Sequence, residues 1–132
     1  MNSRITPRER GLLKGALRRV FSRSELRRKV IDASIIKHSD PSRPKVKTWC
    51  LCTTCEILEA KSYMEVDHKD PVVPIKSTLE DMTWDEVVDR IWCEAGNLQP
   101  ICKQCHKTKT KEEQKQRREI KNEAKRSKKS NS

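Results

Sequence analysis

The chain has 132 residues, of which 37% are charged and only 33% are hydrophobic, so a large apolar core is excluded and one small stapled domain is expected. No apolar stretch is long enough to cross a membrane or to serve as a signal peptide, which predicts a cytosolic protein whose six cysteines bind metal or stay reduced. The net charge of +11 is segregated: residues 1–49 carry +10, residues 50–100 carry −7, and residues 101–132 carry +8, a pattern typical of a polyanion binder such as a DNA-binding protein.

Two basic helices are expected at the N-terminal end. The first begins at a capping box with proline at its first position, Thr6-Pro7-Arg8-Glu9, and has apolar residues at helical spacing as far as Phe21. The second begins at another box, Ser22-Arg23-Ser24-Glu25. Residues 1–44 are therefore interpreted as a basic helical extension that ends in a linker at residues 39–44. Its candidate DNA contacts are Arg18, Arg19, Arg27 and Arg28; the alternative is a packing appendage with a solvated basic face.

The middle of the chain, residues 45–111, is expected to form an α+β domain. The stretch SYMEVDH alternates as a short strand, with Met64 and Val66 on one face and Glu65 and Asp67 on the other. A third capping box at residues 83–86 begins a helix that should end near Gly96, and NLQPI is a second short extended piece. A basic helix follows from Cys102 or Lys103, and residues 112–132 are its continuation and a disordered tail that begins near residue 125.

Two C-x-x-C pairs predict a structural zinc site. Each pair can chelate from a single turn, and four thiolates complete a tetrahedral Zn²⁺ site. The 46 residues between the pairs form a tolerable insertion, because the entropy cost of closing a loop rises only slowly with its length. Cys50 competes with the first pair, but the C-x-x-C spacing favours Cys52. Cys93 is expected to be a buried thiol. The four predicted ligands are Cys52, Cys55, Cys102 and Cys105.

His106 follows the second C-x-x-C pair directly. A zinc ion held by four cysteines has no vacant position for it. Neighbouring residues on a helix point about 100° apart, so His106 should face a separate site if Cys105 faces the zinc. Asp67 and His68, at the end of the expected strand, can complete such a site. A carboxylate and an imidazole suit a divalent cation, and another imidazole is free to act as a base near neutral pH.

Three motifs in this order resemble the HNH endonucleases in their zinc-pinned form, which is common in phage and bacterial nucleases. They are Asp67-His68-x-x-Pro71, then Asn97-Leu98, then Cys102-x-x-Cys105-His106-x-x-Lys109-Thr110. The resemblance covers residues 50–110 and implies a ββα-metal fold. It implies that His68 is the general base, that Asp67 and His106 bind a catalytic Mg²⁺ or Mn²⁺, and that Asn97 holds the loop next to His68. Lys109 is a candidate phosphate contact.

The resulting hypothesis is a metal-dependent DNA endonuclease that hydrolyses phosphodiester bonds. A noncatalytic zinc protein that binds nucleic acid through its basic arms is the alternative, and RNA cleavage remains open because hydrolysis does not identify the sugar. One departure from the family concerns the segment between Pro71 and Asn97, where many relatives have glycines and this chain has a whole helix. The approach of the substrate to the site is therefore expected to differ. Oligomeric state and target sequence are not encoded in these patterns.

Overall fold

The computed structural model describes residues 4–130 as a small α+β fold with four helices and two small antiparallel sheets. In the described range, no helix is both long and apolar enough to span a membrane. The elements in chain order are α1 (Pro7–Phe21), α2 (Glu25–Ala33), β1 (Ile35–Ile36), β2 (Trp49–Leu51), β3 (Leu58–Ala60), β4 (Met64–His68), α3 (Trp84–Ile91), β5 (Leu98–Cys102) and α4 (Lys103–Ser130).

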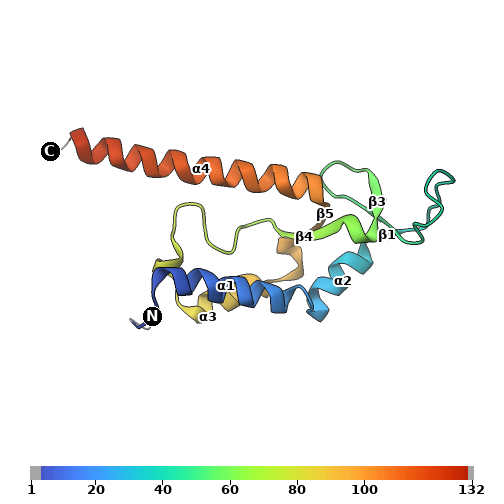
Figure 1. The fold of residues 1–132 in the computed structure, drawn as a ribbon, viewed down its shortest axis with the longest axis horizontal. Coiled ribbons are helices and arrows are strands. Elements are labelled where there is room, and N and C mark those ends of the chain that lie inside the picture. The colour runs from blue at the N-terminus through green and yellow to red at the C-terminus, as the bar shows by residue number, and fades with distance from the viewer. Residues whose placement is uncertain (1–3, 131–132) are drawn as a thin grey trace.

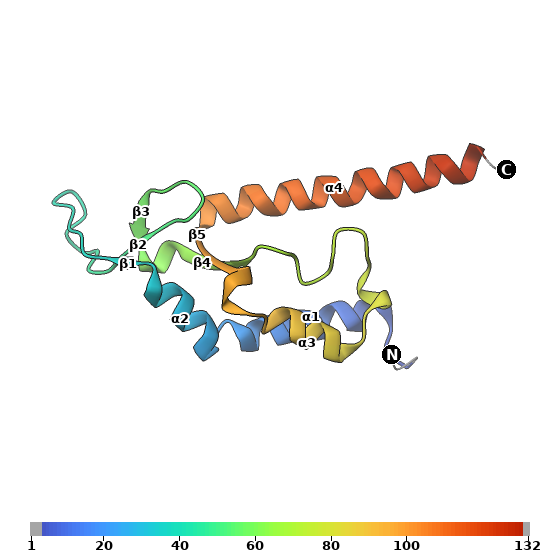
Figure 2. The ribbon, with the colours of Figure 1, turned by 180° about the vertical axis from the view of Figure 1, so that it is seen from behind.

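The two sheets lie at one end of the molecule, and the helices extend from them (Figure 1). One sheet has the order β1-β2-β3, and the other is the pair β4-β5, in which Met64 is opposite Cys102 and His68 is opposite Leu98. Seen from either side, α4 runs along one edge and α1 and α3 along the other, with the segment between β4 and α3 between them (Figure 2). The strands β4 and β5 with the start of α4 form a ββα unit.

The helix starts follow the capping residues, with one correction. Thr6 and Thr83 form capping boxes at the starts of α1 and α3, as expected. The expectation that Ser22 caps the second helix is wrong, because Ser22 instead closes the end of α1. Ser24 is the N-cap of α2, and its hydroxyl accepts a hydrogen bond from the backbone N–H of Arg27. A three-residue break, Ser22 to Ser24, therefore separates the helices.

The N-terminal helices are part of the hydrophobic core and are not an appendage. Phe21 of α1 is 5% exposed and belongs to a cluster with Val72, Val87, Ile91 and Leu98, which we call the groove-side core. Ile31 of α2 is 3% exposed. It belongs to a second cluster, the cysteine-side core, together with Cys50, Cys52, Met64, Ile101 and Cys102. The basic helical extension predicted for residues 1–44 therefore contributes side chains to both clusters.

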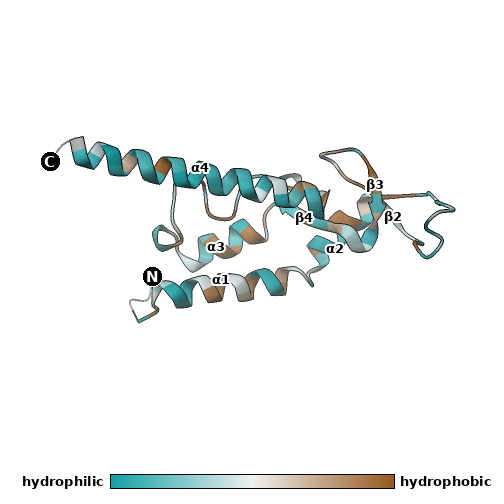
Figure 3. Ribbon diagram, turned by 45° about the horizontal axis from the view of Figure 1, so that its top comes forward, coloured by the Kyte–Doolittle hydropathy of each residue, from teal (hydrophilic) through white to brown (hydrophobic). Residues whose placement is uncertain are grey.

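The C-terminal helix is longer than expected. The expected disordered tail is helical as far as Ser130, and residues 131 and 132 lie outside the described range. Lys, Arg, Glu, Gln and Ala dominate this stretch and no Gly or Pro interrupts it, so the helix can continue although its outer turns are polar on most sides (Figure 3). Conversely, α3 ends at Ile91, before the expected stop at Gly96.

Candidate metal centres

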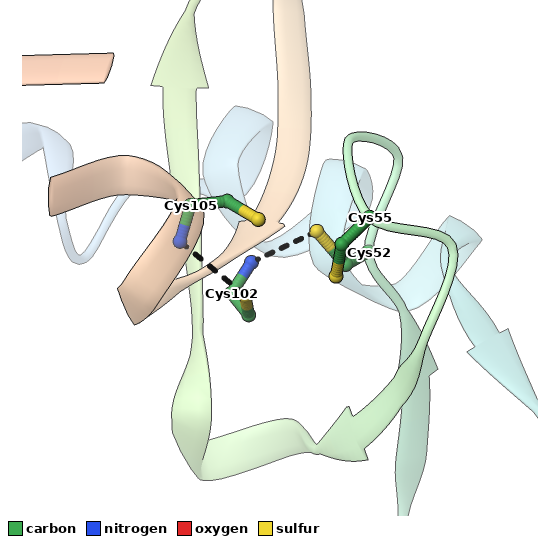
Figure 4. Close-up of side chains that lie close together, drawn as sticks. All are labelled: Cys52, Cys55, Cys102 and Cys105. Atoms are coloured by element: carbon green, nitrogen blue, oxygen red, sulfur yellow. Dashed lines mark hydrogen bonds between the residues drawn. The ribbon is translucent and has the colours of Figure 1, made fainter. Parts of the chain in front are cut away.

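Four cysteines converge in the structure, as their spacing predicts. Cys52 and Cys55 come from the turn after β2, Cys102 ends β5, and Cys105 lies in the first turn of α4 (Figure 4). Their sulfur atoms all lie within 4.8 Å of one another. A tetrahedral ion with Zn–S bonds of about 2.3 Å separates its sulfurs by about 3.8 Å, so a small contraction would suit this metal. The cluster can hold a structural Zn²⁺.

The backbone around the cysteines favours thiolate. The N–H of Cys102 donates to Sγ of Cys52 at 3.3 Å, and the N–H of Cys105 donates to Sγ of Cys102 at 3.5 Å. Burial alone would raise the pKa of Cys52, but backbone N–H groups of Cys55, Cys102 and Thr54 lower it to about 7. Burial and the neighbouring sulfurs raise the pKa of Cys105 to about 12. One thiolate thus forms readily and opposes ionisation of the next, a conflict that a bound cation removes.

The remaining two cysteines lie outside the cluster. Cys50 is fully buried in the cysteine-side core, which confirms the choice of Cys52 from the C-x-x-C spacing. Cys93 differs from its expectation: it follows the end of α3, is half-buried, and accepts a hydrogen bond from the side-chain amide of Asn97 at 3.5 Å.

His106 faces a second cluster on the other side of the same helical turn. Its Nδ1 donates a hydrogen bond to the carboxylate of Glu65, which leaves the lone pair of the neutral imidazole on Nε2. That Nε2 lies 3.8 Å from Oδ1 of Asp67. Glu65 and Asp67 are two residues apart on β4 and so share a face of the strand. Glu65 was not among the expected site residues, although the alternation of β4 placed it beside Asp67.

Asp67 is 6% exposed, and its two carboxylate oxygens have different surroundings. Oδ2 accepts hydrogen bonds from Gln99 Nε2 and from Lys109 Nζ, both at 2.8 Å. Oδ1 is the oxygen that faces His106 Nε2. Gln99 is the cross-strand neighbour of Asp67 in β5, so the pairing of the strands fixes this carboxylate. Hydrogen bonds thus hold Oδ2 of Asp67 in place, while Oδ1 faces the imidazole of His106.

His68 lies on the opposite face of β4 and is held from two directions. Its Nε2 is 2.7 Å from the carbonyl oxygen of Ile91, which can only accept, so Nε2 carries the proton and Nδ1 has the lone pair. The Phe21 ring packs against the imidazole with a centroid distance of 5.3 Å. Burial, with smaller effects of the Arg18 and Lys109 charges, lowers the pKa of His68, so the neutral form is favoured near neutral pH.

Asn97 holds the chain that follows His68. Its Oδ1 accepts a hydrogen bond from the N–H of Asp70 at 2.9 Å, and its backbone carbonyl accepts one from the N–H of Lys69 at 2.8 Å. Both contacts hold the loop that follows His68. Asp67, His68 and His106 all line one groove, and Asn97 is not among its lining residues.

The basic residues divide into three groups. Arg18 and Arg27 line the groove that contains His68. Arg19 lines a different hollow, and Arg28 is exposed outside both hollows. Lys109 has a structural role, because its ammonium donates to the carbonyl oxygens of His68 and Lys69 and pairs with Glu113 at 3.0 Å as well as with Asp67. Although burial acts in the opposite direction, these two carboxylates raise the pKa of Lys109.

No family model, no curated protein and no solved structure matched the chain. The chemistry of the two clusters is therefore argued from the residues themselves.

Proposed function

We propose that the chain is a metal-dependent DNA endonuclease of the HNH type. The observation that carries the proposal is the arrangement of the first turn of α4 against β4. Cys105 faces the sulfur cluster, and the next residue, His106, faces Asp67 at 3.8 Å with an available lone pair. His68, held as a neutral imidazole, lies at the end of the same strand.

The donor set beside β4 fits a catalytic divalent cation. Asp67 Oδ1 and His106 Nε2 both present lone pairs to each other, and no hydrogen lies between them in the neutral imidazole. Two ligands of one octahedral ion with bonds of about 2.1 Å lie about 3 to 4 Å apart, which accommodates the observed separation. Glu65 on the far nitrogen completes the carboxylate–histidine arrangement that is usual for metal-bound imidazoles. A Mg²⁺ or Mn²⁺ held here would withdraw charge from the scissile phosphate and its leaving oxygen.

The chain's own residues supply the proton transfer and the positioning. Nδ1 of His68 accepts a proton from a water molecule as that water attacks phosphorus. The bond from phosphorus to the 3′-oxygen breaks, and this oxygen takes a proton from solvent while His68 returns its proton to solvent, which leaves a 5′-phosphate and a 3′-hydroxyl. The Ile91 carbonyl and the Phe21 ring hold the imidazole in position, and the Ile91 carbonyl favours the tautomer with the proton on Nε2. Lys109 holds the carbonyl oxygen of His68, and Asn97 holds the backbone that follows it.

The test is cleavage of supercoiled plasmid with Mg²⁺ or Mn²⁺ by the wild type and by His68→Ala. Loss of the base should reduce the nicking rate by about 10²- to 10⁴-fold without loss of bound zinc. His38→Ala is the matched control, because His38 packs against Trp49 at 4.9 Å and does not line the groove. Wild-type nicking by His68→Ala would remove this residue from the mechanism.

The same assay separates the enzyme from a noncatalytic zinc-containing DNA-binding protein. Binding of the plasmid by the wild type, with no nicking in any divalent metal, would favour the binding protein. The intact set of Asp67, His68 and His106 around one groove favours the enzyme, because a binding protein has no use for a neutral, positioned imidazole.

A further inference from the structure

A groove of about 1000 Å³ runs from the Asp67–His106 cluster along the space between α1 and α4. Its walls are α1 on one side and α4 on the other, and the segment at residues 71–79 forms part of its floor. Figure 1 shows the two helices on opposite edges with this segment between them. Helices that are distant in the sequence thus build one continuous channel that ends at His68.

Both walls carry positive charge. Lys14 and Arg18 project from α1, Arg27 from α2, and Arg117 and Lys121 from α4. His106 and Arg117 are eleven residues apart, which is three turns of helix and about 16 Å along α4. Arg117 and Lys121 therefore extend the positive charge along α4, away from His106.

The positive charge of the groove is not balanced by its own acids. Three carboxylates line it, and each already has a partner: Glu65 pairs with His106, and both Asp67 and Glu113 pair with Lys109. Among residues 4–130, neither Lys14 nor Arg18 forms an ion pair within 4.0 Å. By contrast, Lys29, Lys61 and Arg90, outside the groove, each pair with an acid.

The cations are also close enough to repel one another. Burial and the charges of Arg18 and Arg117 lower the pKa of Lys14, so α1 and α4 hold like charges in proximity across the groove. Like charges gathered in a concave, partly buried place cost free energy that a bound polyanion recovers. Arg117 is anchored by the carbonyl oxygens of Val73 and Pro74, which fixes its charge in the groove.

We propose that Lys14 and Arg18 of α1, with Arg117 of α4, hold the phosphate backbone of a DNA strand in this groove and lead it to His68. The proposal rests on the proposed function for its choice of DNA as the occupant. It assigns DNA contact to both helices and excludes Arg19 and Arg28, which point elsewhere. Arg18 and His68 line the same groove, so a phosphate held by Arg18 would lie on the side of the groove that contains the imidazole.

The test measures binding of a short DNA duplex as a function of salt, in the His68→Ala background so that cleavage does not interfere. Lys14→Gln/Arg18→Gln should make the dependence of log Kd on log salt shallower by about 2 and weaken binding about 60-fold near 0.1 M salt, as expected for two lost phosphate contacts. These two side chains form no ion pair, so the variant should fold; circular dichroism and zinc content check this.

Arg19→Gln/Arg23→Gln is the matched control, because it removes the same charge from the same region but from the hollow outside the groove. This control should change the slope of log Kd against log salt by less than half as much as Lys14→Gln/Arg18→Gln does. Equal losses in the two double variants would overturn the proposal, and so would an unchanged slope in Lys14→Gln/Arg18→Gln. The charge-conserving Lys14→Arg/Arg18→Lys should keep the wild-type slope.

The outcome is independent of catalysis. A groove-specific loss of binding in a protein that never nicks DNA would support the groove and refute the nuclease. Nicking by the wild type, together with equal slopes in the two double variants, would refute the groove and leave the nuclease standing.

Discussion

The two sides of the first turn of α4 differ in what satisfies their side chains. On the sulfur side, Cys52 and Cys102 receive hydrogen bonds from backbone N–H groups, and all four cysteines face one another. On the carboxylate side, His106, Glu65, Asp67 and Lys109 already bind one another. A set of converging thiols has little to hold it together without a cation, whereas a network of ion pairs is stable by itself. The sulfur side is therefore expected to support the fold, and the carboxylate side to carry the chemistry.

Each side also has its own hydrophobic support. Ile31 of α2 packs in the cysteine-side core, and Phe21 of α1 packs in the groove-side core against His68. The short break between α1 and α2 thus directs neighbouring helices to different sites. If this division is real, variants should separate into those that lose the fold and those that lose only the reaction.

The largest effect is expected for Cys102→Ser. Structural zinc in small domains contributes about 10 to 16 kcal/mol of apparent binding free energy, more than a domain of this size has in reserve. The variant should lose both bound zinc and its cooperative thermal transition, measured by metal analysis and circular dichroism. Cys93→Ser, outside the cluster, should keep both. Stoichiometric zinc and a wild-type thermal transition in Cys102→Ser would contradict the claim that the sulfur side supports the fold.

His106→Ala should have the opposite effect to Cys102→Ser, although His106 is the residue next to Cys105 in α4. The variant should lose the reaction and keep the fold. Removal of a proposed metal ligand should reduce plasmid nicking by at least about 100-fold, because the cation would no longer be held beside Asp67. The side chain is half-buried and outside both hydrophobic clusters, so the melting temperature and the zinc content should stay near those of the wild type. Loss of zinc in this variant would place the imidazole on the sulfur side.

A pair of core variants tests the division of the two supports. Phe21→Ala removes a ring that is 5% exposed and should destabilise the protein by about 3 kcal/mol, while Ile31→Ala should cost about 2 to 3 kcal/mol. Phe21→Ala should reduce nicking strongly and should have a smaller effect on how well the protein retains zinc against a chelator. Ile31→Ala should reduce zinc retention strongly and should have a smaller effect on nicking. If one variant were the more damaging in both the nicking assay and the zinc-retention assay, the two clusters would act as a single core.

The elements nearest the metal centres were predictable because local chemistry determines them. The C-x-x-C spacing identified the four cysteines that converge, and the 100° step between helical neighbours predicted that Cys105 and His106 would face different clusters. The alternation of Met64–His68 placed β4 correctly, and its pairing with the NLQPI stretch follows the two short extended pieces. These features depend on residues close together in the sequence.

Features that depend on tertiary packing were not predictable in the same way. The apolar stripe of α1 could not reveal that Phe21 would pack on His68, forty-seven positions away, so α1 and α2 were taken as an extension. The position of Lys109 in the sequence could not reveal that its ammonium contacts four oxygen atoms of the chain itself. Polarity suggested disorder at the C-terminal end, whereas helix propensity without a breaker continues α4 to Ser130.

The smallest effect is expected for Glu65→Gln. On the carboxylate side, this variant separates a role in metal affinity from a role in proton transfer. The amide can still accept a hydrogen bond from Nδ1 of His106, so the tautomer and the fold are preserved, but the negative charge that makes the imidazole a stronger ligand is lost. Nicking should fall about tenfold at low Mg²⁺ or Mn²⁺ and recover as the metal concentration rises, because the defect lies in metal affinity. Glu59→Gln, which alters an exposed pair with Arg43, is the control and should leave the metal dependence unchanged. A loss that saturating metal does not restore would instead place Glu65 in the proton transfer itself.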